Sequence, residues 1–132
     1  MNENDIANLF TELGMKVERG NAPGVYTQLI ISPPLGDGPK VTVIRPSSTS
    51  NYFVVTMVIE TDEGRLTPSK VRAITTELAK MNVEVYMTPP DKPRLIHIAK
   101  IIYAEGANKN DAINAVTLVK NAGIVAFNLL AD

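Results

Sequence analysis

His97, the only histidine of the 132-residue chain, is the residue with the widest range of chemistry. An imidazole titrates near neutrality, so His97 could act as a general base if a carboxylate oriented it beside a substrate cleft. Its stretch of sequence is apolar, and at strand spacing it shares a face with Leu95, Ala99 and Ile101. These neighbours favour a structural histidine. A small ligand-binding domain or enzyme that uses His97 is the alternative to a non-catalytic protein-binding module.

Carboxylates gather at Glu60, Asp62 and Glu63, where their oxygens could hold a hard cation. The spacing of acidic and amide residues that defines a calcium-binding loop is absent. The chain also contains no cysteine, which excludes disulfide bonds, thiolate catalysis and cysteine-ligated zinc or iron–sulfur sites. A solvated turn is the favoured interpretation of the acidic cluster, and we predict no metal and no cofactor.

Neither the glycines nor the serines follow a phosphate-binding pattern. Residues 36–39, Gly-Asp-Gly-Pro, lack the spacing of the dinucleotide-binding and P-loop motifs. Residues 47–50 offer hydroxyl groups, but only Arg45 lies nearby as a basic anchor. We interpret this second segment as a flexible loop.

Charge argues against a nucleic-acid-binding surface. The chain has 13 basic and 14 acidic side chains, for a net charge of −1, whereas binding to a phosphate backbone favours a basic surplus. Lys92, Arg94 and Lys100, together with Tyr86 and Tyr103, could pair with phosphates and stack on bases. Because aromatic residues are only 5% of the chain and tryptophan is absent, nucleic acid is not an expected partner.

The spacing of apolar residues predicts an α+β fold in a single domain, residues 1–132, with three helices and an antiparallel sheet of about five to six strands. Asn4 or Asp5 caps the first helix, and Thr67 followed by Pro68 opens the second. Short connections between successive strands favour antiparallel pairing, with the helices packed on one face. The order is α-ββββ-α-ββ-α: helices near 6–13, 67–81 and 108–130, and strands near 15–19, 25–32, 41–44, 52–59, 83–87 and 94–103.

The third predicted helix has more apolar surface than its own sheet should cover. Its polar residues fall on a narrow stripe, and most of the remaining circumference is apolar. We predict that this surplus contacts a second copy of the chain, so aspartate at Val125 or Phe127 should disfavour association. The alternatives are a helix sunk in its own core or one broken at Gly123. The candidate interface residues are Val119, Ala122, Val125, Ala126, Phe127, Leu129 and Leu130.

The sequence gives no sign of membrane targeting. Residues 1–5 are polar and acidic, unlike a secretory signal, and no uninterrupted apolar stretch approaches the ~20 residues that span a bilayer. We expect a cytoplasmic protein that makes no membrane contact.

Residues 101–111 carry a resemblance to a known group of folds. A long apolar strand there leads through a short acidic turn into a helix that starts near Asp111. With the helix that ends at Gly14 and the helix that opens at Thr67-Pro68, the chain resembles secretion-chaperone-like α/β domains, and more narrowly uncharacterised archaeal proteins of that fold. The resemblance implies a homodimer that binds other proteins and lacks enzymatic activity. That group offers no chemical motif, so it implies no site residues, and the strand near 15–19 departs from its simplest pattern.

Overall fold

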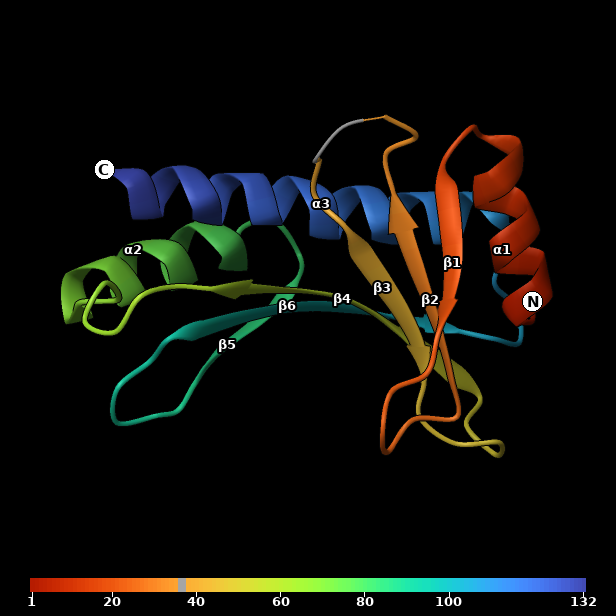
Figure 1. The fold of residues 1–132 in the computed structure, drawn as a ribbon, viewed down its shortest axis with the longest axis horizontal. Helices are drawn as coiled ribbons and strands as arrows, with labels where there is room; N and C mark the ends of the chain where they lie inside the picture. Colours follow the sequence, from red (N-terminus) through yellow and green to blue (C-terminus); the bar gives the residue numbers. More distant parts are fainter. Residues whose placement is uncertain (36–37) are drawn as a thin grey trace.

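Three helices and six strands make up the computed structural model, which describes residues 1–35 and 38–132 (Figure 1). The elements are α1 (Glu3–Glu12), β1 (Lys16–Gly20), β2 (Thr27–Ser32), β3 (Val41–Arg45), β4 (Tyr52–Glu60), α2 (Pro68–Ala79), β5 (Glu84–Thr88), β6 (Leu95–Tyr103) and α3 (Lys109–Ala131). The predicted α+β fold and the order α-ββββ-α-ββ-α are confirmed.

The six strands form one antiparallel sheet in the order β1-β2-β3-β4-β6-β5. After β4 the chain crosses through α2 to the far edge strand β5, and β6 then returns between β5 and β4. Figure 1 shows β1, β2 and β3 running at a steep angle to β4, β5 and β6, so the sheet is strongly twisted. All three helices lie on one side of this sheet, with α3 along its whole length, α1 at one end and α2 at the other.

Local capping signals start the helices. The side chain of Asn2 accepts a hydrogen bond from the Asp5 amide, and the Asp5 carboxylate accepts one from the Asn2 amide, both at 2.9 Å. The predicted cap at Asn4 or Asp5 is therefore wrong, because Asn2 and Asp5 together form a two-way capping box one turn earlier. Thr67 caps α2 as predicted, with Pro68 in its first turn.

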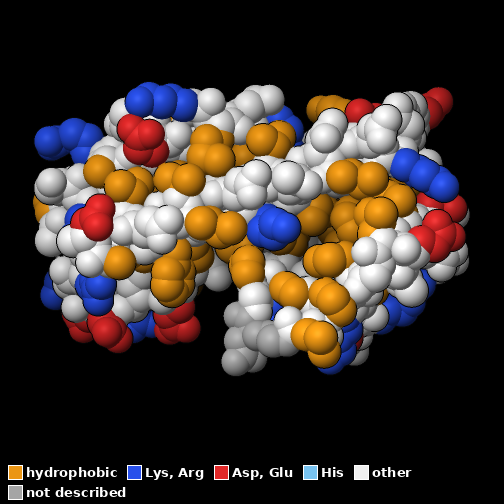
Figure 2. Space-filling model, turned by 90° about the horizontal axis from the view of Figure 1, so that it is seen from above, with side chains coloured by type: hydrophobic (Ala, Val, Ile, Leu, Met, Phe, Trp, Pro, Cys, Tyr) orange, Lys and Arg blue, Asp and Glu red, His pale blue; other side chains and the backbone are white. Residues whose placement is uncertain are grey.

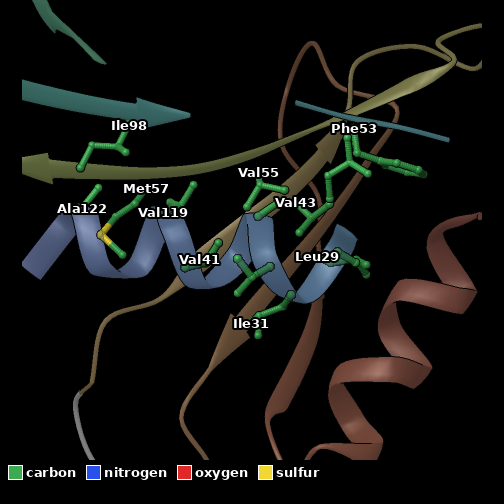
Figure 3. Packing of buried hydrophobic residues seen from close by; sticks show 14 of the residues in the cluster. Leu29, Ile31, Val41, Val43, Phe53, Val55, Met57, Ile98, Val119 and Ala122 are labelled. Carbon is green, nitrogen blue, oxygen red and sulfur yellow. The ribbon is translucent and has the colours of Figure 1, made fainter. Parts of the chain in front are cut away.

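Alternating apolar residues of the strands and one stripe of α3 form the core between the two layers. Figure 3 shows Met57 of β4 and Ile98 of β6 packed against Val119 and Ala122 of α3. Gly123 is buried in the same contact, and a methyl group at this position would overlap the sulfur of Met57. The predicted alternative of a break at Gly123 is wrong: α3 is one continuous helix, and the glycine allows it to lie close to β4.

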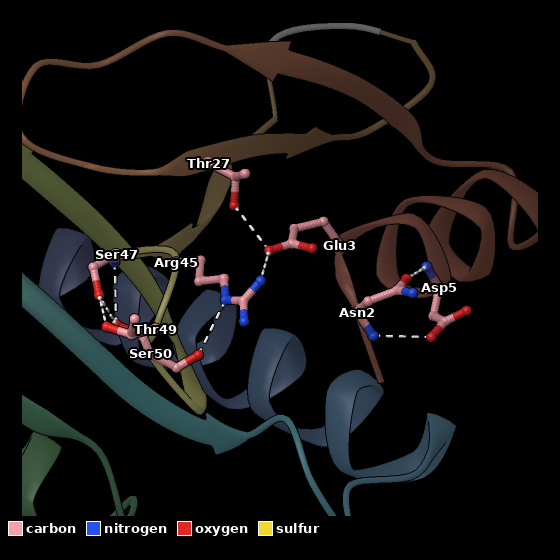
Figure 4. Close-up of polar contacts among 8 residues, drawn as sticks. All are labelled: Asn2, Glu3, Asp5, Thr27, Arg45, Ser47, Thr49 and Ser50. Carbon is pink, nitrogen blue, oxygen red and sulfur yellow. Dashed lines mark hydrogen bonds and ion pairs between the residues drawn. The ribbon is translucent and has the colours of Figure 1, made fainter.

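The loop that precedes β4 is tied to the N-terminal helix. Arg45 donates hydrogen bonds to the Ser50 carbonyl at 3.1 Å and to the Glu3 carboxylate at 3.0 Å (Figure 4). The loop closes on itself, because the Ser50 amide donates to the Ser47 carbonyl and the Ser47 amide donates to the Ser50 hydroxyl, each at 3.1 Å. These bonds give the serine-rich segment a defined turn. Of the predicted glycine and proline segment 36–39, Gly36 and Asp37 lie outside the described residues.

By length and composition, α3 could also cross a membrane. No uninterrupted apolar stretch marks this helix in the sequence, because polar residues recur along it. Eight of its residues are buried in the protein's own core, and the core helix of a soluble protein has the same composition.

Candidate functional site

His97 lies on the side of the sheet that carries no helix. The strand register places it between Val58 of β4 and Tyr86 of β5. Its ring stacks on that of Tyr86, with centroids 4.4 Å apart and planes 4° from parallel. The Thr88 hydroxyl lies 2.8 Å from Nε2 of His97, at hydrogen-bond distance. Two neighbours on β5 therefore fix the position of the imidazole.

The surroundings of His97 are those of a packed side chain. Burial lowers the pKa of His97 below its ordinary value of 6.5, because desolvation penalises the charged form. Within the described part of the chain, no carboxylate contacts the ring as an ion pair or hydrogen bond. The orienting acid that a general base needs is absent among these described contacts, so this arrangement does not position His97 as a general base.

The acidic cluster predicted as a solvated turn is exposed. Glu60 lies 3.8 Å from Arg94, and Glu63 lies 3.8 Å from Lys92, all with exposed side chains. No set of three metal-ligating side chains occurs among residues 1–35 and 38–132. These ion pairs involve Lys92 and Arg94, two of the three basic residues that could have paired with phosphates of a nucleic acid.

The structure divides the predicted interface residues of α3 into two groups. Val119, Ala122, Ala126 and Leu130 are buried against the protein's own sheet. Val125 and Leu129 are half-buried, and Phe127 is 65% exposed. Ile124, which was not among the predicted residues, is 45% exposed. Figure 2 looks onto this helix-bearing side and shows apolar side chains interrupted by polar ones.

The opposite face of the sheet is more continuously apolar. Cross-strand partners share a face, and Val54 of β4 is opposite both Ile44 of β3 and Ile101 of β6. Tyr52 is opposite Tyr103, which is 63% exposed, and Ile101 is 48% exposed. We name this surface the open-face patch and define it by Ile30, Ile44, Tyr52, Val54, Val58, Tyr86, Ala99, Ile101 and Tyr103.

Charged residues are confined to the margins of this face. On β2, β3, β4 and β6 the only charged side chain that points to it is Glu60, at the end of β4. The others are Lys16 and Glu18, paired at 2.9 Å on the edge strand β1, and Glu84 on the edge strand β5. An antiparallel sheet with one side in water normally places polar residues there. This face carries only a few uncharged polar residues, among them Gln28, Thr42 and Thr56, between its apolar ones.

A second feature arises where β3 and β4 separate. β3 is registered with β4 only opposite residues 54–56, whereas β6 follows β4 as far as Glu60. The Thr61 amide donates to the Arg94 carbonyl at 2.8 Å, so the main-chain groups of Thr61 point toward β6. Main-chain groups alternate in direction along a strand, and the odd-numbered residues of β4 therefore also direct theirs toward β6. The amide and carbonyl groups of Val58 and Glu60 therefore point the other way, where the described strands place no residue opposite them.

A groove of about 540 Å³ lies along this free edge. Residues 57–60 form one wall, and Ile124 and Phe127 of α3 form another. Pro39 and Lys40, just before β3, complete it. The groove combines apolar walls with main-chain groups that have no partner among the described residues.

Neither surface is among the predicted sites. The sequence signal for the open-face patch is the apolar character of 52–59 on both faces of the strand. The signal for the groove was weaker, because the point where β3 leaves β4 depends on long-range pairing.

The family described as an uncharacterized conserved protein family, DUF2299, matches residues 2–130. None of the curated proteins matches the chain in sequence.

Two solved structures share the fold. An uncharacterized protein from Methanothermobacter thermautotrophicus is 12% identical, with a TM-score of 0.81 over 98% of this chain and 96% of that chain. YbjN from E. coli is 14% identical, with a TM-score of 0.56 over 99% of this chain and 90% of that one. The predicted likeness to uncharacterised archaeal proteins is thus confirmed in fold, and the likeness to secretion chaperones stays a prediction.

Proposed function

The chain belongs to the DUF2299 family of uncharacterized conserved proteins, and we propose that it is a non-catalytic protein-binding module that pairs with a second copy of itself. The observation that carries this proposal is the open-face patch. Val54 and Ile101 lie inside it and Tyr103 lies at one end, and no helix of this chain covers them. Self-pairing through this face would remove their apolar surface from water.

The charge pattern supports a second copy as the occupant. In a two-fold dimer the same patch meets itself, so like charges near its centre would repel. The centre of this face is uncharged, and its few charged residues lie at the margins. An uncharged apolar surface is complementary to itself, whereas it offers no electrostatic preference to a strongly acidic or basic partner.

The size of the face also fits. Strands ~4.8 Å apart that rise ~3.3 Å per residue give six strands of this length a flat area of roughly 600 Å². Side-chain relief raises the accessible area toward the ~800 Å² that each partner contributes to a stable interface. By comparison, the exposed apolar part of α3 is small, because four of its predicted interface residues are already buried.

The test is the mass of the full chain in solution at micromolar concentrations, measured by light scattering after size exclusion. We expect a dimer for the wild type and a monomer for Ile101→Asp, because association would bury an unpaired carboxylate. Phe127→Asp is the matched control on α3, where the exposed position tolerates a charge, and we expect it to stay dimeric. Circular dichroism confirms that both variants fold.

Two results contradict the proposal. If the wild type is monomeric at these concentrations, the chain does not pair with itself. If Phe127→Asp dissociates the dimer and Ile101→Asp does not, the copies meet through α3, as the sequence analysis predicted, and the sheet face is not the interface.

A further inference from the structure

We propose that the free edge of β4 at residues 58–60 binds an extended apolar peptide segment of another protein, which adds to the sheet as a strand. The groove beside this edge is separate from the centre of the open-face patch, and binding there does not require self-pairing. The inference therefore goes beyond the proposed function and is tested separately from it.

The main chain of β4 determines what kind of molecule fits. Val58 and Glu60 each present one amide and one carbonyl to the groove, two residues apart along a regular strand. This repeat of donors and acceptors, every ~7 Å, is the one that an extended peptide backbone complements. A small ligand would need converging polar side chains, and the side chains of this groove are mainly apolar.

The walls determine the side chains of the peptide. Ile124 and Phe127 are three residues apart on α3, so they project from the same side of the helix, and they are 45% and 65% exposed. Alternate side chains of a bound strand would point toward them and gain apolar contact. The groove contains one cation, Lys40, and one carboxylate, Glu60, so it favours neither an acidic nor a basic peptide.

The shape excludes the same edge of a second copy. The free edge of β4 lies between the start of β3 and the C-terminal half of α3, both of which line the groove. Two such edges, each recessed between its own neighbours, could not approach to the ~4.8 Å that separates paired strands. A single slim peptide strand can enter.

The experiment titrates the isotope-labelled full chain with three capped octapeptides, in which threonine alternates with valine, isoleucine or phenylalanine. We expect at least one peptide, at up to millimolar concentration, to shift the backbone amide signals of Val58 and Glu60 and to slow their hydrogen exchange. The same peptides with their central amides N-methylated keep the side chains but lose the donors, and we expect them not to bind.

Variants separate the contribution of the main chain from that of the side chains. Glu60→Pro removes an amide that faces the groove, and Glu60→Ala removes the same side chain but keeps the amide. We expect the proline variant to bind the peptide roughly fivefold more weakly than the alanine variant, the effect of one hydrogen bond. Phe127→Ser, at an exposed position, should weaken binding about tenfold through lost apolar contact. Phe127→Ser keeps the test decisive if proline at position 60 disturbs the strand.

Four results would overturn the proposal. The first is that none of the peptides shifts the amide signals of Val58 and Glu60. The second is that the N-methylated peptides bind as well as their parents. The third is that the shifted signals belong to Val54 and Ile101, which would place the peptide on the open-face patch. Protection of Val58 and Glu60 that grows with protein concentration alone would show a second copy in the groove, and also counts against the peptide.

Discussion

At the scale of single residues, His97 shows how apolar neighbours decide the role of a titratable group. The sequence favoured a structural histidine, because Leu95, Ala99 and Ile101 share its strand face, and the structure places it on that apolar face without a carboxylate partner. The stack on Tyr86 and the contact with Thr88 could not be predicted. They depend on the register between two strands, which local sequence does not specify.

The lowered pKa of His97 makes stability depend on pH. The folded state favours the neutral ring, so below pH 6.5 the unfolded chain binds a proton that the folded chain resists. We expect the free energy of unfolding to fall as the pH drops through 6.5 and to level off below the folded-state pKa. Urea unfolding between pH 7.5 and 5.5 measures this, with His97→Gln as the control that should lack this component. An equal pH dependence in both proteins would contradict the assignment to His97.

At the scale of elements, the helix and strand positions were largely predictable and their long-range partners were not. Thr67-Pro68 and the segment from Asn108 to Asp111 are local signals, and α2 and α3 begin there. The start of α1 was misplaced, because several polar residues near the N-terminus can cap a helix and only the structure shows which one pairs with Asp5. The apolar residues of α3 that were predicted to form one interface differ in burial, because packing against the sheet buries Val119 and leaves Phe127 exposed.

The contact between α3 and β4 depends on the absence of a side chain at Gly123. Alanine there gains ~1 kcal/mol in helix propensity, but its methyl group overlaps Met57, and overpacking costs ~1–3 kcal/mol. We expect Gly123→Ala to lower the free energy of unfolding by about 1 kcal/mol. In a Met57→Val background the overlap with the sulfur is gone, so the same substitution should be neutral or stabilising. Chemical unfolding of the four proteins in this double-mutant cycle measures the coupling.

The C-terminal end of α3 is stabilised by a cation from α2. The Lys70 ammonium donates to the carbonyls of Leu130 at 2.8 Å and Leu129 at 3.3 Å, which the helix itself leaves unpaired. We expect Lys70→Met, which keeps most of the aliphatic stem, to cost about 1 kcal/mol of unfolding free energy. Lys80→Met is the control: it breaks only an exposed ion pair with Glu77 and should change stability by less than ~0.5 kcal/mol. Equal effects of the two substitutions would show that the carbonyl contacts contribute little.

At the scale of the whole molecule, one arrangement accounts for both proposed surfaces. All three helices cover one side of a twisted six-stranded sheet, which leaves the other side open. The separation of β3 from β4 creates a stretch of edge inside the sheet that no described strand pairs with. Sequence periodicity predicted the layers, because it reports which residues are apolar. It could not predict which apolar face would remain uncovered, because that depends on where all the helices pack.

Self-pairing through the open-face patch should itself depend on pH, because His97 lies within that face. Covering the ring with a second copy would desolvate it further and make its protonation more costly in the dimer than in the monomer. The charged or titratable groups that face it are Tyr86 and Glu84 on β5 and Glu60 on β4, and neither glutamate contacts the ring. Such a dimer would bind fewer protons than two monomers, and we expect its dissociation constant to rise as the pH falls from 7.5 to 5.5. Sedimentation equilibrium measures this change, and His97→Gln, which carries no titrating ring, should show a smaller one.

A dimer that weakens equally in both proteins would place the interface away from His97, whereas a dimer unaffected by pH in the wild type would mean that the ring stays in water.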